Sequence, residues 1–186
     1  MRNIIIACFI LIIGAGCISY YNTPKGEFKG SLDIRWVEND YFLFLPNKND
    51  PLIFERANGE KIQPKAFCTD GGSIPQFLWG LKNLSPWGYA PAYIIHDWMF
   101  RTNRCKYETY TFKNSVSVME ESLKTLMEEN KKTRSYFVFK SITAAISSDI
   151  AKNLWKNGDC KALQEKDPCK ERKDENKGEL LRTIKF

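Results

Sequence analysis

The sequence contains a single histidine, His96. This scarcity excludes several enzyme classes, because their sites need more than one imidazole. A zincin requires both histidines of an H-E-x-x-H helix, and a metal-dependent phosphohydrolase of the two-histidine type cannot be built either. Any imidazole chemistry in this protein must therefore use His96.

The apolar run near the start of the chain is too short to cross a bilayer. It extends from Ile4 to Ile13, ten residues, whereas a membrane-spanning helix needs about 20. Arg2 precedes the run and small residues follow it, which is the composition of a secretory signal peptide. We therefore predict that residues 1–16 are a signal peptide.

A cysteine follows the predicted cleavage point. The sequence I-G-A-G-C, ending at Cys17, is typical of a bacterial lipoprotein, although Gly14 stands where leucine is usual. An ordinary signal peptide and an uncleaved anchor are the alternatives. Lipid chains on Cys17 would anchor the protein stably, since each buried CH₂ group contributes about 0.8 kcal/mol. Residues 17–29 would then be a lipidated tether. Ile18 is not the aspartate that retains lipoproteins at the inner membrane, so we expect an outer-membrane protein facing the periplasm if the host is Gram-negative.

The charge balance is only moderately basic. Lysine and arginine number 28 and acidic residues 22; without Arg2 the difference is 27 − 22 = +5. Positive and negative charges are mixed, so the sequence has no basic stripe for nucleic acid, and we expect no nucleic-acid partner. Residues 156–186 hold 16 charged residues among 31, which predicts a solvated charged tail.

The cysteine count supports export. Cys8 lies in the predicted signal peptide and Cys17 would carry lipid, which leaves an even number for disulfides in an exported chain. The remaining four are Cys68, Cys105, Cys160 and Cys169. Three pairings are open. The short separation of the last two favours 160–169 together with 68–105.

The pattern of apolar residues predicts an α+β fold, with a small N-terminal antiparallel sheet followed by a helical half. Strand signals cover Leu32–Val37, Tyr41–Leu45, Leu52–Ala57 and Glu60–Gln63. The last two flank Asn58-Gly59, a strong two-residue hairpin signal. The globular domain is expected to occupy residues 30–155.

Four helices are predicted after the strands. A short one begins at the S-x-x-Q capping box of Ser73 and ends at Trp79, and a second begins near Pro91 and ends near Arg101. The third includes the apolar stripe from Val116 to Met127, and the fourth covers residues 134–155.

The stretch from Phe67 to Arg101 holds the candidate site. It places Asp70 before a Gly-Gly turn and sets His96 beside Asp97 on a helix. One imidazole and two carboxylates are a ligand set that suits Zn²⁺, Mn²⁺ or Fe²⁺, and the same residues are the candidate catalytic groups.

Each of these residues also has an ordinary structural role. A lone histidine on an apolar helix face is often a core residue, and Asp97 has an i,i+4 partner in Arg101. Asp70 suits an Asx-type turn.

The turn itself offers weaker signals. Ser73 would serve as a nucleophile only if it is not the helix cap, and Cys68 would form a thiol dyad with His96 only if it is not in a disulfide. Gly71, Gly72 and Ser73 together form a weak candidate anion site at a helix N-terminus.

Three motifs in order resemble a known family. They read T-D-G-G-S-I-P from Thr69, S-P-W-G-Y-A-P-A from Ser85 and I-I-H-D-W-M-F from Ile94. They are similar to motifs of the domain-of-unknown-function 1353 family, found in bacteriophage genomes and in bacteria, and the likeness covers about residues 30–155. That family typically adds an aspartate in the next helix. Here the helix reads S-V-S-V-M-E-E-S-L, so either Glu120 or Glu121 substitutes for the aspartate or the third acidic group is missing. The resemblance implies a fold and a site, and no reaction.

Two function classes remain open at this point. The first is a lipid-anchored binding or interaction module of the cell envelope, of prophage origin, with an envelope protein or cell-wall ligand as its partner. The second is a metal-assisted hydrolase that acts on a cell-wall or other envelope component, with a divalent metal as its cofactor.

Overall fold

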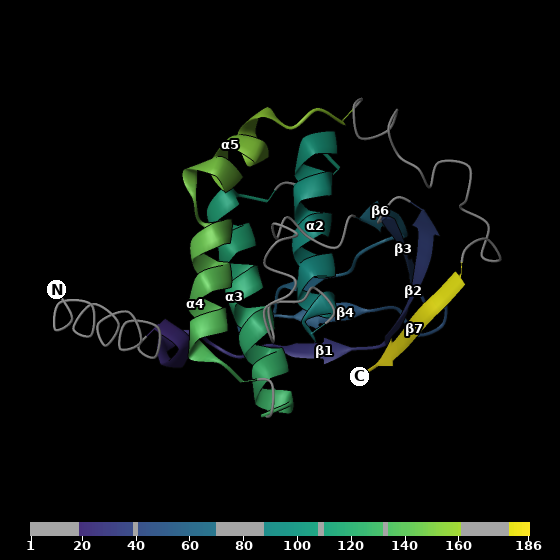
Figure 1. The fold of residues 1–186 in the computed structure, drawn as a ribbon, viewed down its shortest axis with the longest axis horizontal. Coiled ribbons are helices and arrows are strands. Elements are labelled where there is room, and N and C mark those ends of the chain that lie inside the picture. The colour runs from purple at the N-terminus through teal and green to yellow at the C-terminus, as the bar shows by residue number, and fades with distance from the viewer. Residues whose placement is uncertain (1–18, 39–40, 70–87, 108–109, 132–133, 161–178) are drawn as a thin grey trace, which may run out of the picture.

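The computed structural model describes residues 19–38, 41–69, 88–107, 110–131, 134–160 and 179–186. Within these ranges the fold is α+β, as the sequence predicts, with antiparallel sheets beside a group of helices (Figure 1). None of the helices in these ranges is long and apolar enough to span a bilayer.

The larger sheet has four antiparallel strands in the order β6-β3-β2-β7. Their bounds are Phe67–Thr69 for β6, Tyr41–Pro46 for β3, Ser31–Glu38 for β2 and Glu179–Lys185 for β7. Alternation in β2 puts Leu32 and Ile34 on the buried face. Pro46 stands opposite Leu32 at the end of β3, a position where a strand tolerates a missing N–H.

The smaller sheet has three antiparallel strands in the order β1-β4-β5, which are Glu27–Lys29, Ile53–Glu55 and Lys61–Ile62. The predicted hairpin at Asn58-Gly59 joins β4 to β5. Gly59 has φ +85°, the left-handed conformation that the turn needs, and the Arg56 amide donates to the Glu60 carbonyl at 2.8 Å.

Four helices pack beside the sheets. They are α2 (Ala90–Cys105), α3 (Phe112–Glu129), α4 (Tyr136–Ile146) and α5 (Asp149–Asn157). Pro91 lies in the first turn of α2, as predicted. Thr111, Ser135 and Ser148 cap the other three by accepting a backbone N–H.

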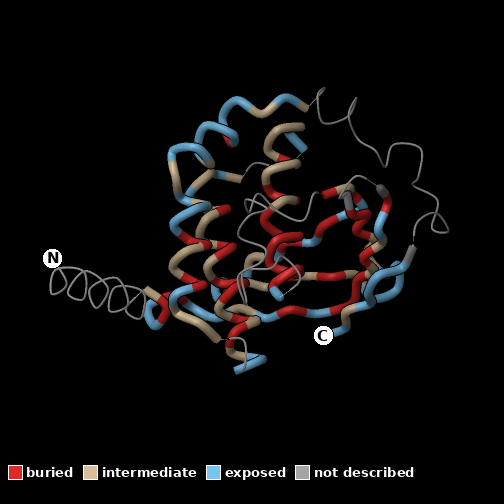
Figure 2. The backbone as a smooth tube through the Cα atoms, in the orientation of Figure 1, coloured by how far each residue is buried: buried red, intermediate tan, exposed pale blue. Residues whose placement is uncertain are grey.

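α2 is the centre of the packing. Its Ile94, Ile95 and Met99 join the core between the helices and the sheets, whereas Ala92 and Tyr93 join a second core with α3 and α4. Buried positions therefore run along α2 and the inner sheet faces, and α4 and α5 are exposed on their outer sides (Figure 2).

The helix predicted over residues 134–155 is two helices in the structure. Ser147 ends α4 by donating its hydroxyl to the Thr143 carbonyl, and Ser148 caps α5 through the Ala151 amide. These side-chain bonds compete with the helical backbone pattern and stop it. Beyond the break, Ile150 is 75% exposed and Trp155 is buried.

Both ends of the described chain pack on the domain. Tyr20 is fully buried and residues 27–29 form β1, where the sequence suggested a polar tether. Residues 179–185 form β7, which the charged composition of the tail did not predict. Pairing with β2 and the packing of Ile184 against the core provide the stabilisation that the local sequence lacks.

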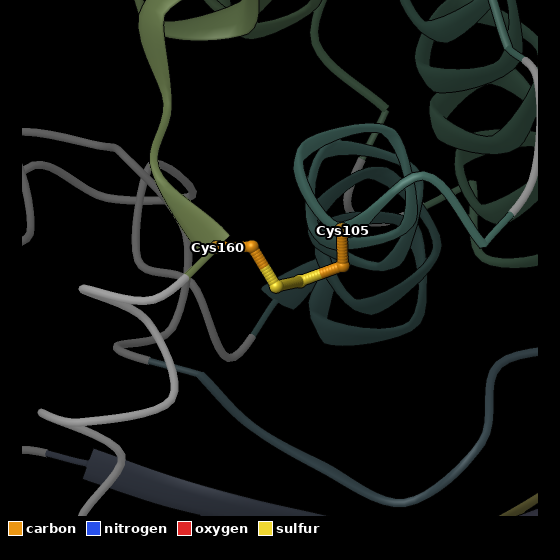
Figure 3. Close-up of a disulfide and its surroundings, with 2 residues drawn as sticks. All are labelled: Cys105 and Cys160. Atoms are coloured by element: carbon orange, nitrogen blue, oxygen red, sulfur yellow. A yellow bond between two sulfur atoms is a disulfide. The ribbon is translucent and has the colours of Figure 1, made fainter.

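The favoured disulfide pairing is wrong. Cys105, at the end of α2, is bonded to Cys160, which follows α5 (Figure 3). Cys68 also takes part in a disulfide, and Cys169 lies outside the described residues. Sequence separation misled the prediction because the packing of α5 on α2 brings residues 55 positions apart into contact.

Candidate functional site

His96 lies inside the protein, on the middle of α2. Its side chain is only 7% exposed and its ring packs against Phe100, with 4.8 Å between ring centroids. Burial lowers the pKa of the imidazole to about 4. The ring is therefore neutral at neutral pH. Its Nε2 atom is buried, and no group in the described part of the chain forms a hydrogen bond with it.

Asp97 faces a different neighbour. The Thr69 hydroxyl, at the end of β6, donates to the Asp97 carboxylate at 2.6 Å. This bond joins the strand that precedes the Gly-Gly turn to the helix that carries His96. The contact lies at Thr69, one residue before the predicted Asp70 turn. Asp70, Gly71, Gly72 and Ser73 lie outside the described residues, so their place in the site remains a prediction.

Tyr93 shares the helix face of Asp97, one turn earlier. Burial raises the pKa of the Tyr93 hydroxyl, and its electrostatic interactions with Tyr89 and Asp97 raise it further, so the group stays protonated. Its oxygen and Nε1 of Trp98 are both buried, and neither has a hydrogen-bond partner within the described ranges. The buried polar atoms of α2 that the described protein groups leave unsatisfied therefore include those of Tyr93, His96 and Trp98.

Among the described residues, the His96 ring and the Asp97 carboxylate contact different side chains. Consecutive helical residues point about 100° apart, and the His96 ring meets Phe100 whereas Asp97 meets Thr69. No group of three His, Cys, Asp or Glu side chains within the described ranges is placed to hold a metal ion. A three-ligand site would need Asp70.

The comparison with known proteins identifies the central part of the chain. The model of a protein family of unknown function, DUF1353, matches residues 49–139. Residues 49–139 belong to the DUF1353 family. No curated protein and no solved structure matches the chain. The DUF1353 match extends from the loop before β4 into α4, and it contains Thr69, His96 and Asp97.

A buried charge network is a second feature of this DUF1353 domain, and the sequence analysis missed it. The Arg56 guanidinium is 10% exposed and contacts the carboxylate of Glu121 on α3, which is 4% exposed. Arg56 also donates to Glu60 at 2.7 Å, Asn114 at 2.8 Å and Ser117 at 2.7 Å. The network ties the β4–β5 hairpin to α3.

The network also explains the glutamates that stand where the DUF1353 resemblance leads us to expect an aspartate. Both oxygens of Glu121 are used, one by Arg56 and Ser117 and the other by the Ala57 amide. Glu120 lies beside Lys140 of α4, and burial raises the pKa of its carboxyl group. Glu121 thus has a structural role in joining α3 to the hairpin. A hairpin arginine followed 65 residues later by a helix glutamate gives no signal in the sequence.

Proposed function

We propose that this protein is an exported, lipid-anchored envelope protein whose DUF1353 domain acts as a binding module. The observation that carries the choice is the burial of His96, which is 7% exposed. A general base must reach the proton it removes, directly or through one water. The sole imidazole of the chain is packed against Phe100 and serves the core.

Exposed apolar side chains at the edge of the larger sheet support a binding role. β7 is an edge strand of this sheet. Its Leu180 and Leu181, and Trp36 on the neighbouring β2, are each more than 40% exposed. Within the described residues β7 pairs only with β2. An open strand edge flanked by apolar side chains suits the addition of an extended peptide from an envelope protein.

Mass spectrometry of the mature protein tests the anchor. We expect an N-terminal peptide that begins at Cys17 and carries acyl chains, and we expect the Cys17→Ser variant to leave the membrane fraction. An unmodified N-terminus, or a Cys17→Ser variant that stays membrane-bound, would remove the lipoprotein from the proposal.

Photo-crosslinking in intact cells tests the binding face. A crosslinking residue at position 181 on β7 is expected to give one adduct of constant mass, and the same residue at the exposed position 48 is expected to give none. Leu180→Glu in the same chain should abolish the adduct, because a charge cannot be desolvated at the contact without cost. A position-181 adduct that survives Leu180→Glu would contradict the proposed face.

Some buried polar atoms on α2 have no hydrogen-bond partner among the described groups. They support a second candidate function, that of a metal-assisted hydrolase. Buried polar atoms without partners, here Nε2 of His96 and the Tyr93 hydroxyl, are uncommon and occur where a ligand or water completes the site. Elemental analysis of the purified protein decides between the two. Stoichiometric Zn, Mn or Fe that disappears in His96→Gln would support the hydrolase, whereas equal metal content in both would leave the binding module. Circular dichroism of the variant establishes that it has folded.

A further inference from the structure

We propose that the outer face of α4 lies against the membrane surface, so that this side of the domain contacts the bilayer directly. This inference deepens the proposed function, because it rests on the lipid anchor at Cys17. The proposed partner of this face is the headgroup region of a bilayer that contains anionic lipid.

The first argument is the short reach between the anchor and α4. Tyr20 is fully buried, with its ring against Tyr136 at 5.0 Å and Phe139 at 5.2 Å, and its hydroxyl donates to Glu128 at 2.6 Å. Cys17 is three residues before Tyr20, and three residues span at most about 11 Å. Lipid chains on Cys17 would therefore enter the bilayer close to the start of α4. Three residues are too few to hold the domain away from the bilayer.

The second argument is the composition of α4. Its eleven residues include one charged side chain, Lys140. Phe137 is 56% exposed, and Ala144 and Ala145 are exposed on the same helix face two turns later. Apart from Lys140 and Ser141, the side of α4 around Phe137 is apolar, and an apolar helix face is normally covered. α4 forms the outer edge of the molecule beside residues 19–22, so within the described chain nothing covers that face (Figure 1).

The third argument is the set of aromatic and basic side chains that border this face. Tyr21 is 65% exposed and its hydroxyl meets that of Tyr136 at 2.8 Å, so two tyrosines lie beside Phe137 where the anchor enters. Tyrosine is enriched at membrane interfaces because its ring is apolar and its hydroxyl is polar. Lys131, exposed at the turn before α4, adds positive charge, whereas Lys140 lies beside Glu120 and Glu128 is paired with Arg134. This charge is complementary to anionic headgroups.

Fluorescence quenching tests the orientation on the full-length lipidated protein. The protein is reconstituted into vesicles of phosphatidylethanolamine and phosphatidylglycerol, with and without brominated lipids that quench tryptophan on contact. Phe137→Trp introduces a reporter on α4, and Leu181→Trp introduces a matched exposed reporter on β7, on the far side of the molecule (Figure 1). The parent protein gives the background of the native tryptophans.

We expect the emission added by Phe137→Trp to be mostly lost in brominated vesicles and that added by Leu181→Trp to be kept. Equal quenching of the two reporters, or none at position 137 in vesicle-bound protein, overturns the orientation and leaves the anchor in place. If the Phe137→Trp reporter is shielded from quenching and the native mass is doubled, a second copy of the protein covers α4. That result also overturns the proposed orientation. Failure of the lipidation test, with protein that does not float with vesicles, overturns the anchor itself.

Discussion

His96 is a neutral imidazole in an apolar setting, and its environment makes a prediction about acid stability. The folded protein holds its pKa at about 4, below the ordinary value of 6.5. The unfolded chain therefore binds a proton first as the pH falls. The free energy of unfolding should be independent of this group above about pH 7 and should decline between pH 6.5 and 4, by up to about 3 kcal/mol.

Urea unfolding at a series of pH values measures this effect. Carboxyl groups titrate in the same range, so the informative quantity is the difference between the parent and His96→Gln. We expect that difference to shrink as the pH is lowered from 7 to 4, since the variant has no imidazole to protonate. Parallel curves would mean that His96 is not desolvated in the folded protein.

The Arg56–Glu121 pair is a second single-residue test. Glu121→Ala leaves the Arg56 guanidinium buried with only Glu60 as a charged partner, and breaking such a pair costs about 3–5 kcal/mol. Glu60→Ala removes a carboxylate that is 32% exposed and should cost under about 1 kcal/mol. Chemical denaturation of both variants gives the comparison. Similar losses would show that the buried contact is no stronger than the exposed one.

At the scale of elements, the Cys105–Cys160 disulfide fixes α5 on α2. Beside it the Asn103 side chain donates to the Trp155 carbonyl at 3.1 Å, and Trp155 packs edge-on to Phe100 at 4.8 Å. α5 is nine residues long, too short to be stable alone. Its helical state therefore depends on this attachment.

The double variant Cys105→Ser/Cys160→Ser tests the attachment. The bridge closes a loop of 55 residues, and chain entropy predicts a loss of about 4 kcal/mol in the free energy of unfolding. Hydrogen exchange should show the first loss of protection in residues 149–157. Peptide mapping of the oxidised parent should yield a linked 105–160 peptide, and a linked 68–105 peptide would contradict the connectivity.

At the scale of the whole molecule, the last strand, β7, joins the edge of the larger sheet by pairing with β2. The Phe186 amide donates to the Gly30 carbonyl at 3.0 Å, and the Phe186 ring stacks on Phe28 at 4.9 Å. Ile184 packs against the core. The far end of the chain is therefore part of the folded domain.

Truncation after residue 178 tests the contribution of β7. It removes Ile184, which is partly buried against the core and contributes less than the roughly 1.5–3 kcal/mol of a fully buried side chain, and it exposes the backbone edge of β2. We expect a lower unfolding midpoint and concentration-dependent association in light scattering. Leu181→Ser, which changes only an exposed position of β7, should behave like the parent. Unchanged stability of the truncated protein would mean that β7 is dispensable.

Local patterns accounted for the elements whose signals are local. The Asn58-Gly59 turn, the alternation of Leu32 and Ile34, and Pro91 at a helix start each depend on neighbouring residues, and each is found in the structure. β1 and β7 were missed because their strand state comes from pairing with β4 and β2. Composition alone favours solvent for both segments.

The sequence by itself determined the α+β class, the DUF1353 motifs and the position of His96 and Asp97 on one helix, because periodicity and motif order are properties of consecutive residues. Only the tertiary structure decided that His96 is buried, that Glu121 forms an ion pair with Arg56 and that Cys105 forms a disulfide with Cys160. Those outcomes depend on which surfaces meet when α2, α3 and α5 pack. Burial and long-range pairing arise from that packing, and they set what each polar side chain can do.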